Sequence, residues 1–244
     1  MKKTGILLIL PASAVLLIYA QTLEFDFVNW DDNLYVTENR GVSSPEEAGI
    51  RELMLTSYLG YPVPLTILSY RLDYLFNGLD PFYFHLANLI IFIAIVYLLM
   101  SLMISTGSGF VPSLLASLLF AAHPLAVEPV AWVSGRKDLL SLLFALASLA
   151  FFFKAAGFLK TERNRRKSGL FLILSGVSFA LSLVSKPVFV LLPLIFAVKT
   201  DEFVPAGRTK GVLALILSCL VFAAGVITAG MIFQKDVGAL SDPK

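Results

Sequence analysis

Long runs of apolar residues, separated by short polar turns, dominate the pattern along this chain. A membrane-spanning helix needs about 20 predominantly apolar residues, and a shorter helix is tolerated where its end lines a cavity. Seven runs fit this description, and the third and sixth are short. The pattern predicts an all-α membrane protein, a polytopic helical bundle with about seven transmembrane helices. The predicted spans are residues 4–20, 82–103, 109–123, 137–157, 169–185, 187–199 and 211–233.

The first apolar run has two interpretations. Lys2 and Lys3 followed by an apolar stretch are typical of a cleaved signal peptide. However, the run from Gly5 to Ala20 is longer than a usual signal core, and many further spans follow it. We therefore favour an uncleaved first transmembrane helix.

Residues 21–81 form a long segment between the first two spans, which predicts a large first extracytoplasmic loop. Ser44 followed by a proline and a glutamate indicates a helix start, so we expect an amphipathic helix from Pro45 to about Tyr58. A second loop helix is expected over Leu65–Phe76, which is too short for a span. Asp80 and Pro81 then predict the capped start of the second span.

Composition agrees with a lipid-embedded chain. Of the 244 residues, 57% are hydrophobic and 15% are charged, and the mean hydropathy is +0.82. The net charge of +2 is too small to indicate a nucleic-acid partner. Cys219, the single cysteine, lies within an apolar run and is interpreted as a packing residue.

The distribution of charge along the chain predicts its orientation. If the N-terminus is cytoplasmic, the inner segments hold 11 of the 19 lysines and arginines but only three of the 17 acidic residues. This agrees with the excess of basic residues that cytoplasmic loops carry. We therefore expect a multi-pass protein of the cytoplasmic (inner) membrane, with its informative polar residues on the extracytoplasmic face.

The first polar cluster on that face is residues 29–33, shortly after the first span. Asp31 and Asp32, beside Trp30, are suited to general-base work or to holding a divalent cation, because neighbouring carboxylates raise one another's pKa. The alternative is a solvated Asx turn, which the chemistry of the residues alone favours. A divalent cation therefore stays open as a ligand, and no metal site is predicted.

Two further clusters on the same face carry basic residues. One lies between the third and fourth spans, and the other contains Lys186 between two apolar runs. Interfacial anchoring and snorkelling are the alternatives. Arginine and lysine on the outer face instead favour a site for an anionic headgroup presented from the lipid. The residues of the first of these clusters are His123, Glu128, Trp132, Arg136, Lys137 and Asp138.

Several common chemical motifs are absent from the sequence. The chain has no nucleophile motif, no glycine-rich phosphate loop, no HExxH and no CxxC. These absences argue against a covalent hydrolase, a nucleotide-driven pump and a zinc enzyme.

Five segments together resemble a known family. The resemblance is to polytopic glycosyltransferases of the GT-C fold, and most to the transmembrane and tetratricopeptide-repeat O-mannosyltransferase family and its bacterial relatives. The segments occur in the same order to about residue 200. They are FVNWDDNLYV (27–36), YPVPLTILSY (61–70), LDPFYFHLAN (79–88), AAHPLAVEPVAWVSGRKDLLSLLF (121–144) and SKP (185–187).

The resemblance implies a membrane glycosyltransferase that passes a sugar from a polyprenyl-phosphate donor to a protein or glycan acceptor on the extracytoplasmic face. It implies that Asp31 or Asp32 removes the proton of the acceptor hydroxyl. Basic residues would neutralise the departing phosphate, and the remaining polar residues would shape the site. The basic residues are Arg136, Lys137 and Lys186, and the site-shaping residues are His123, Glu128, Asp138 and Trp30.

The chain departs from this family at its C-terminal end. Family members have further spans after the seventh, whereas this chain ends at Lys244, so we expect one GT-C-like domain over residues 1–244 that is incomplete at its C-terminus. Two alternatives stay open: a transporter or flippase of a lipid-linked or anionic substrate, and a non-catalytic membrane fragment. A transporter commonly shows inverted repeats around a midplane site, and the sequence shows no such symmetry.

Overall fold

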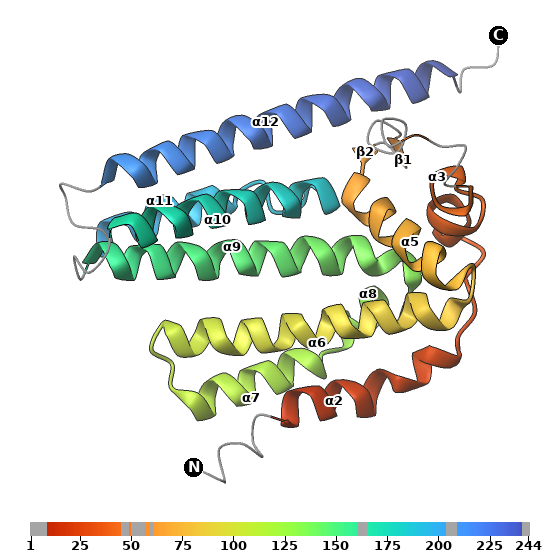
Figure 1. Ribbon diagram of the computed structural model, residues 1–244, viewed down its shortest axis with the longest axis horizontal. Coiled ribbons are helices and arrows are strands. Elements are labelled where there is room, and N and C mark those ends of the chain that lie inside the picture. The colour runs from red at the N-terminus through yellow and green to blue at the C-terminus, as the bar shows by residue number, and fades with distance from the viewer. Residues whose placement is uncertain are drawn as a thin grey trace.

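The computed structural model describes residues 9–44, 49, 57–58, 61–160, 165–203 and 209–240. Seven helices run roughly along one common axis, and the segment between the first two of them lies at one end of the bundle (Figure 1). This segment forms short helices and one pair of very short strands. The described part of the chain is therefore almost entirely helical, which confirms the predicted all-α class.

The helices of the bundle broadly coincide with the predicted spans, except that the sixth begins at Leu192 instead of residue 187 and the seventh ends at Leu240 instead of residue 233. Pro81 opens α6 at its first turn, and the Asp80 side chain accepts a hydrogen bond of 3.1 Å from the Phe82 N–H, as predicted. The bundle comprises α2 (Leu10–Tyr19), α6 (Pro81–Ser105), α7 (Phe110–Ala121), α9 (Arg136–Lys160), α10 (Arg165–Ser185), α11 (Leu192–Phe203) and α12 (Thr209–Leu240).

Four of these helices are long and apolar enough to cross a membrane, which supports a multi-pass membrane protein. They are Pro81–Ser105, Val133–Lys160, Arg166–Ser185 and Thr209–Thr228. A fifth candidate is a pair of helical segments, Phe110–Ala121 and Pro124–Ala131, bent by 59° at the break between them. The predicted number of seven is not confirmed, because α11 has 12 residues and α2 has 10 within the described part of the chain.

The segment after α2 is built from short elements. The predicted loop helix over Leu65–Phe76 is confirmed as α5. The predicted helix from Pro45 lies mostly outside the described residues, and its expected end is wrong, because Ser57 and Tyr58 form a strand. The elements are η1 (Ala20–Glu24), η2 (Asn33–Thr37), α3 (Arg40–Ser43), β1 (Ser57–Tyr58), β2 (Tyr61–Pro62) and α5 (Pro64–Asn77).

The two-residue strands β1 and β2 pair antiparallel, with Tyr58 opposite Tyr61. A different local feature precedes them: η2 is a single turn of π-helix that begins directly after Asp31 and Asp32. Turns of π-helix are rare in proteins, and those that occur often lie at functional sites.

Serines spaced seven residues apart hold α9 against α10. The Ser148 hydroxyl donates to the Ser175 carbonyl at 2.8 Å, and the Ser175 hydroxyl donates to the Ser148 carbonyl at 2.9 Å. One heptad away, the Ser182 hydroxyl donates to the Ser141 carbonyl at 2.8 Å. Small side chains let two helices approach closely where lipid supplies no hydrophobic driving force. This register fixes the start of α9 beside the end of α10.

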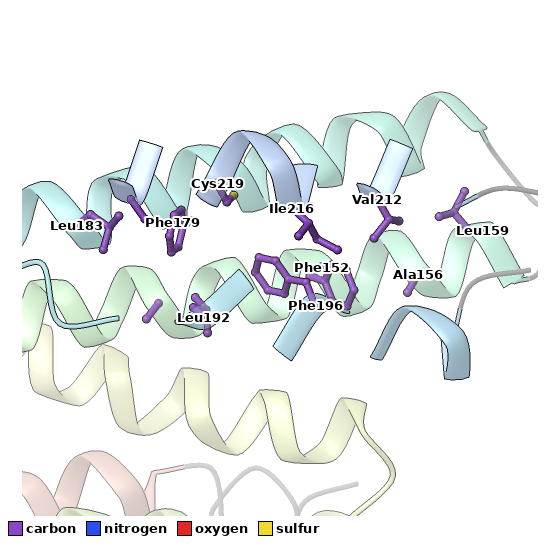
Figure 2. Packing of buried hydrophobic residues seen from close by; sticks show 12 residues of the cluster. Phe152, Ala156, Leu159, Phe179, Leu183, Leu192, Phe196, Val212, Ile216 and Cys219 are labelled. Atoms are coloured by element: carbon purple, nitrogen blue, oxygen red, sulfur yellow. The ribbon is translucent and has the colours of Figure 1, made fainter. Parts of the chain in front are cut away.

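A cluster of buried apolar side chains joins α9 and α10 to α11 and α12 (Figure 2). Phe152 of α9 stacks on Phe196 of α11, with ring centroids 4.6 Å apart. Cys219 is buried in the same cluster, as the packing role predicted. The cluster extends from Leu159 at the end of α9 to Leu183 near the end of α10, so it packs these helices together over most of their length.

Candidate functional site

A tight turn before α9 is the structural centre of the candidate site. The chain passes from α7 through η3 (Pro124–Ala126), α8 (Val127–Ala131) and η4 (Val133–Gly135) into α9. The Tyr70 hydroxyl of α5 donates to the Val133 carbonyl at 2.8 Å, and the Asn88 amide of α6 donates to the Trp132 carbonyl at 3.0 Å. Burial raises the pKa of Tyr70, which keeps this hydroxyl a neutral donor.

Asp32 is the third residue, after Tyr70 and Asn88, whose side chain is hydrogen-bonded to this turn. Its Oδ1 accepts hydrogen bonds from the Ser134 N–H at 2.9 Å and from the Ser134 hydroxyl, and its Oδ2 accepts from the Val28 N–H at 2.9 Å. The side chain is fully buried. Both carboxylate oxygens are thus engaged by donors, and Asp32 fixes the position of the loop that carries Asp31.

Gly135 allows this turn to pass against α8. A Cβ at Gly135 would lie 2.6 Å from the Pro129 carbonyl oxygen and 2.7 Å from the Pro129 Cα, and backbone cannot give way cheaply. The absence of a side chain at Gly135 is therefore a requirement of the turn that carries Arg136.

We expect Gly135→Ala to lower stability by about 1–3 kcal/mol, as overpacking usually does. The matched control is Gly169→Ala in α10, where a Cβ meets nothing within 4 Å and alanine favours the helix by about 0.5–1 kcal/mol. Thermal unfolding in detergent checks both. Equal melting temperatures for the two variants would show that the turn tolerates a shift of α8.

Asp31 has a different environment from Asp32. Its Oδ2 lies 2.9 Å from Lys137 Nζ, and the two side chains are 12% and 8% exposed. Lys137 Nζ also lies 4.3 Å from the centre of the Tyr35 ring and 5.6 Å from that of the Trp132 ring. Such cation–π contacts hold an ammonium group in place. Asp31 therefore keeps one carboxylate oxygen, Oδ1, outside this ion pair.

Arg136 is buried, with 1% of the side chain exposed, and protein groups engage all three guanidinium nitrogens. Nε donates to Asn88 Oδ1 at 2.8 Å, and NH2 donates to the Phe84 carbonyl at 2.8 Å. NH1 lies 2.5 Å from Asp73 Oδ2. Burial raises the pKa of Asp73, and the Arg136 charge opposes that shift.

Arg136 therefore joins α5, α6 and α9, and the guanidinium lies over the Tyr70 ring at 4.5 Å. The sequence predicted that Arg136 binds a donor phosphate. This geometry does not favour that role, because the donors face protein acceptors. It favours a positioning role for the first turn of α9.

Lys186 lies at the end of α10 and is the most accessible of the predicted basic residues. Its Nζ donates to Asp138 Oδ1 at 2.6 Å, and the two side chains are 24% and 41% exposed. The backbone here is held on two sides: the Ser141 hydroxyl donates to the Lys186 carbonyl at 2.8 Å, and the Thr66 hydroxyl donates to the Ser185 carbonyl at 3.1 Å.

An apolar cavity of about 380 Å³ opens beside this ion pair. Asp138 and His123 are its polar lining residues. Its volume falls within the usual range of about 300–1,000 Å³ for small-molecule sites. The apolar lining consists of Phe92, Phe120, Leu125, Ala126, Pro129, Leu139 and Leu142.

The remaining predicted residues occupy different places. His123 caps η3, because its Nδ1 accepts a hydrogen bond of 3.2 Å from the Leu125 N–H. Glu128 is exposed in the first turn of α8. Trp30 is 74% exposed. In the described part of the chain, no three His, Cys, Asp or Glu side chains lie close enough to hold a metal ion.

Residues that sequence reasoning did not assign complete the site. Asn88, Tyr70 and Asp73 contact the turn or Arg136, and Ser134 contacts Asp32. Asn88 and Tyr70 each end one of the segments that carry the family resemblance. An asparagine in an apolar span is itself a signal, because a polar group there needs a partner.

Comparison with known proteins identifies relatives of this chain. It is 33% identical over 156 residues to "Protein O-mannosyl-transferase tmtc2" of Xenopus laevis. The aligned region covers 60% of the chain and 18% of the relative. It is 31% identical over 194 residues to "Protein O-mannosyl-transferase TMTC4" of Mus musculus, covering 70% and 26%. The chain is a homologue of the TMTC protein O-mannosyl-transferases.

The resemblance to the transmembrane and tetratricopeptide-repeat O-mannosyltransferase family is thereby confirmed. A third TMTC protein, "Protein O-mannosyl-transferase TMTC3" of Homo sapiens, is 40% identical over 94 residues, which are 38% of the chain and 10% of the relative. The chain thus spans at most about a quarter of the length of these three TMTC proteins. No protein-family model matches the chain, and no solved structure shows a significant match.

Proposed function

We propose that this protein is a membrane glycosyltransferase that moves a mannosyl group from a polyprenyl-phosphate donor to a protein hydroxyl. Its relatives are named protein O-mannosyl-transferases, which supports the reaction class. The lipid-linked donor is supported by the apolar lining of the cavity and by the ion pair of Asp138, a lining residue, with Lys186. The partners would be membrane lipid, the lipid-linked sugar and a protein acceptor.

The donor would place its hydrocarbon chain in the apolar cavity and its phosphate at Lys186. The cavity walls come from α6, α7, α8 and α9, so the chain would be sheltered between helices. Lys186 supplies a positive charge beside Asp138, a cavity residue. A lysine at this position would stabilise the negative charge that develops on the leaving phosphate.

Asp31 would act as the base. The acceptor hydroxyl oxygen attacks the anomeric carbon, and the bond from that carbon to the phosphate oxygen breaks. The hydroxyl proton moves to the Asp31 carboxylate, and the electron pair of the broken bond leaves on polyprenyl phosphate. Asp32 is a weaker candidate, because its two oxygens already accept hydrogen bonds from Ser134 and Val28.

One observation carries the proposal. Lys137 and Asp138 are successive residues of the first turn of α9, and they hold Asp31 on one side and Lys186 on the other. The predicted base and the predicted phosphate ligand are therefore tied to neighbouring positions of one rigid element. Arg136, the preceding residue, would position that element.

The same end of the bundle would face the extracytoplasmic side. The opposite end carries the basic residues Lys160, Arg165, Arg166 and Lys167, as expected of a cytoplasmic end. From its start, α2 runs toward the end of the bundle that carries α3 and α5 (Figure 1), which accords with a cytoplasmic N-terminus.

The test is binding of a polyprenyl-phosphate mannose to the full chain in lipid nanodiscs. We expect Lys186→Ala to weaken binding about 10–100-fold, which corresponds to the loss of one hydrogen bond to a charged group. The matched control is Lys210→Ala, an exposed lysine at the other end of the bundle, which should bind as the wild type does. Equal affinity of wild type and Lys186→Ala would contradict the proposed donor site.

A further inference from the structure

We propose that Asp138 makes the donor site discriminate between the lipid-linked sugar and the lipid product of the reaction. The inference rests on the proposed function. In the proposed transfer the donor is a phosphodiester, and the polyprenyl phosphate that remains is a phosphomonoester. The two ligands share one hydrocarbon chain, so the cavity binds that part of both alike. They differ in the charge of the phosphate.

The charge difference follows from phosphate chemistry. A phosphodiester carries one negative charge at neutral pH, whereas a phosphomonoester carries about 1.5 to 2, because its second pKa is about 6. A residue that senses this extra charge must lie close to the phosphate and must keep a charge of its own.

Asp138 meets both conditions. It lines the cavity that would hold the hydrocarbon chain, and its Oδ1 lies 2.6 Å from Lys186 Nζ, the charge that would hold the phosphate. Any phosphate that approaches Lys186 therefore approaches the Asp138 carboxylate as well. Like charges at such short range repel, and the repulsion grows with the charge on the ligand.

Two consequences follow for the site. First, Asp138 competes with the phosphate for Lys186, so both ligands bind less tightly than Lys186 alone would allow. Second, the more highly charged product is penalised more than the donor. The ion pair of Asp138 and Lys186 thus favours release of polyprenyl phosphate once the sugar has moved, and Asp138 is a specificity-determining residue for the proposed reaction.

The backbone at Lys186 is held by hydrogen bonds that do not involve Asp138. The Lys186 carbonyl accepts the Ser141 hydroxyl at 2.8 Å, the Lys186 N–H donates to the Ser182 carbonyl at 3.1 Å, and the neighbouring Ser185 carbonyl accepts the Thr66 hydroxyl. Removal of the Asp138 charge therefore leaves the Lys186 backbone in place, and the side chain is then available to bind a phosphate.

The experiment measures dissociation constants of the full chain in nanodiscs at pH 7.5 for two ligands with the same hydrocarbon chain, polyprenyl phosphate and polyprenyl-phosphate mannose. We expect Asp138→Asn to tighten both. We also expect the ratio of the product constant to the donor constant to fall about three- to ten-fold, the effect of one charge at about 6 Å in a partly solvated site. Asp138→Glu, which keeps the charge, should keep the wild-type ratio.

Glu24→Gln, which removes an exposed carboxylate outside the ion pair, is the matched control and should leave the ratio unchanged. An unchanged ratio in Asp138→Asn would overturn the inference, and so would weaker binding of both ligands, because Asp138 would then orient the lysine instead of competing for it. If the wild type binds neither lipid phosphate, the proposed function itself fails.

Discussion

Asp31→Asn is expected to lower the rate of mannosyl transfer about 10²–10⁴-fold, the usual contribution of a positioned general base. The amide cannot take up the proton of the acceptor hydroxyl. Its oxygen can still accept the hydrogen bond of Lys137 Nζ, which lies 2.9 Å from the native carboxylate. The protein should therefore stay folded and keep its affinity for the donor. The measurement is the rate of transfer from polyprenyl-phosphate mannose to a serine- and threonine-containing acceptor polypeptide.

Substitutions of two other carboxylates serve as comparisons for Asp31→Asn. Asp26→Asn removes an exposed carboxylate five residues away and should transfer at the wild-type rate. Asp32→Asn places an amide among three donors and should lower stability by about 1–3 kcal/mol, the cost of an unsatisfied buried group. Full transfer by Asp31→Asn, together with loss of transfer in a stably folded Asp32→Asn, would identify Asp32 as the base.

Arg136→Met is expected to destabilise the protein by about 3–5 kcal/mol, the usual cost of removing one partner of a buried ion pair. The substitution leaves Asp73 without the charge 2.5 Å away and leaves Asn88 Oδ1 and the Phe84 carbonyl without their donors. The contacts between α5, α6 and the start of α9 depend on these bonds. Thermal unfolding in detergent measures the loss.

The matched control for this substitution is Arg40→Met, at an exposed position of α3, which should melt as the wild type does. The double variant Arg136→Met with Asp73→Asn should recover part of the loss, because no unpaired buried charge remains. If Arg136→Met has the same melting temperature as Arg40→Met, the buried guanidinium does not hold the helices together. Its predicted contact with phosphate then becomes the better interpretation.

The sequence predicts the helices more securely than the site because apolar runs are local signals. The starts of α5 and α6 follow from proline and from the Asp80 cap, which are read within a few residues. The start of α11 differs from the predicted one, because the helix begins at Leu192 and residues 187–191 form turns before it. Within a continuous apolar run, the residue types do not indicate where such turns end and the helix begins.

The roles of neighbouring charged residues could not be separated from sequence. Asp31 and Asp32 are alike in the sequence, and only the fold brings Ser134 to Asp32 and Lys137 to Asp31, more than 100 positions away in each case. Arg136, Lys137 and Asp138 are likewise consecutive, but they point to three different sets of partners around α9. Helical geometry predicts that divergence, whereas the partners come from segments distant in sequence.

The central claim is that one end of the bundle carries a donor site at Lys186 and a separate base at Asp31. Donor affinity and transfer rate, measured on the same nanodisc preparations of Asp31→Asn and Lys186→Ala, test it most directly. The account predicts that Asp31→Asn binds the donor as the wild type does and loses transfer, whereas Lys186→Ala loses affinity. Loss of donor affinity in Asp31→Asn, or wild-type transfer in both variants, would contradict it.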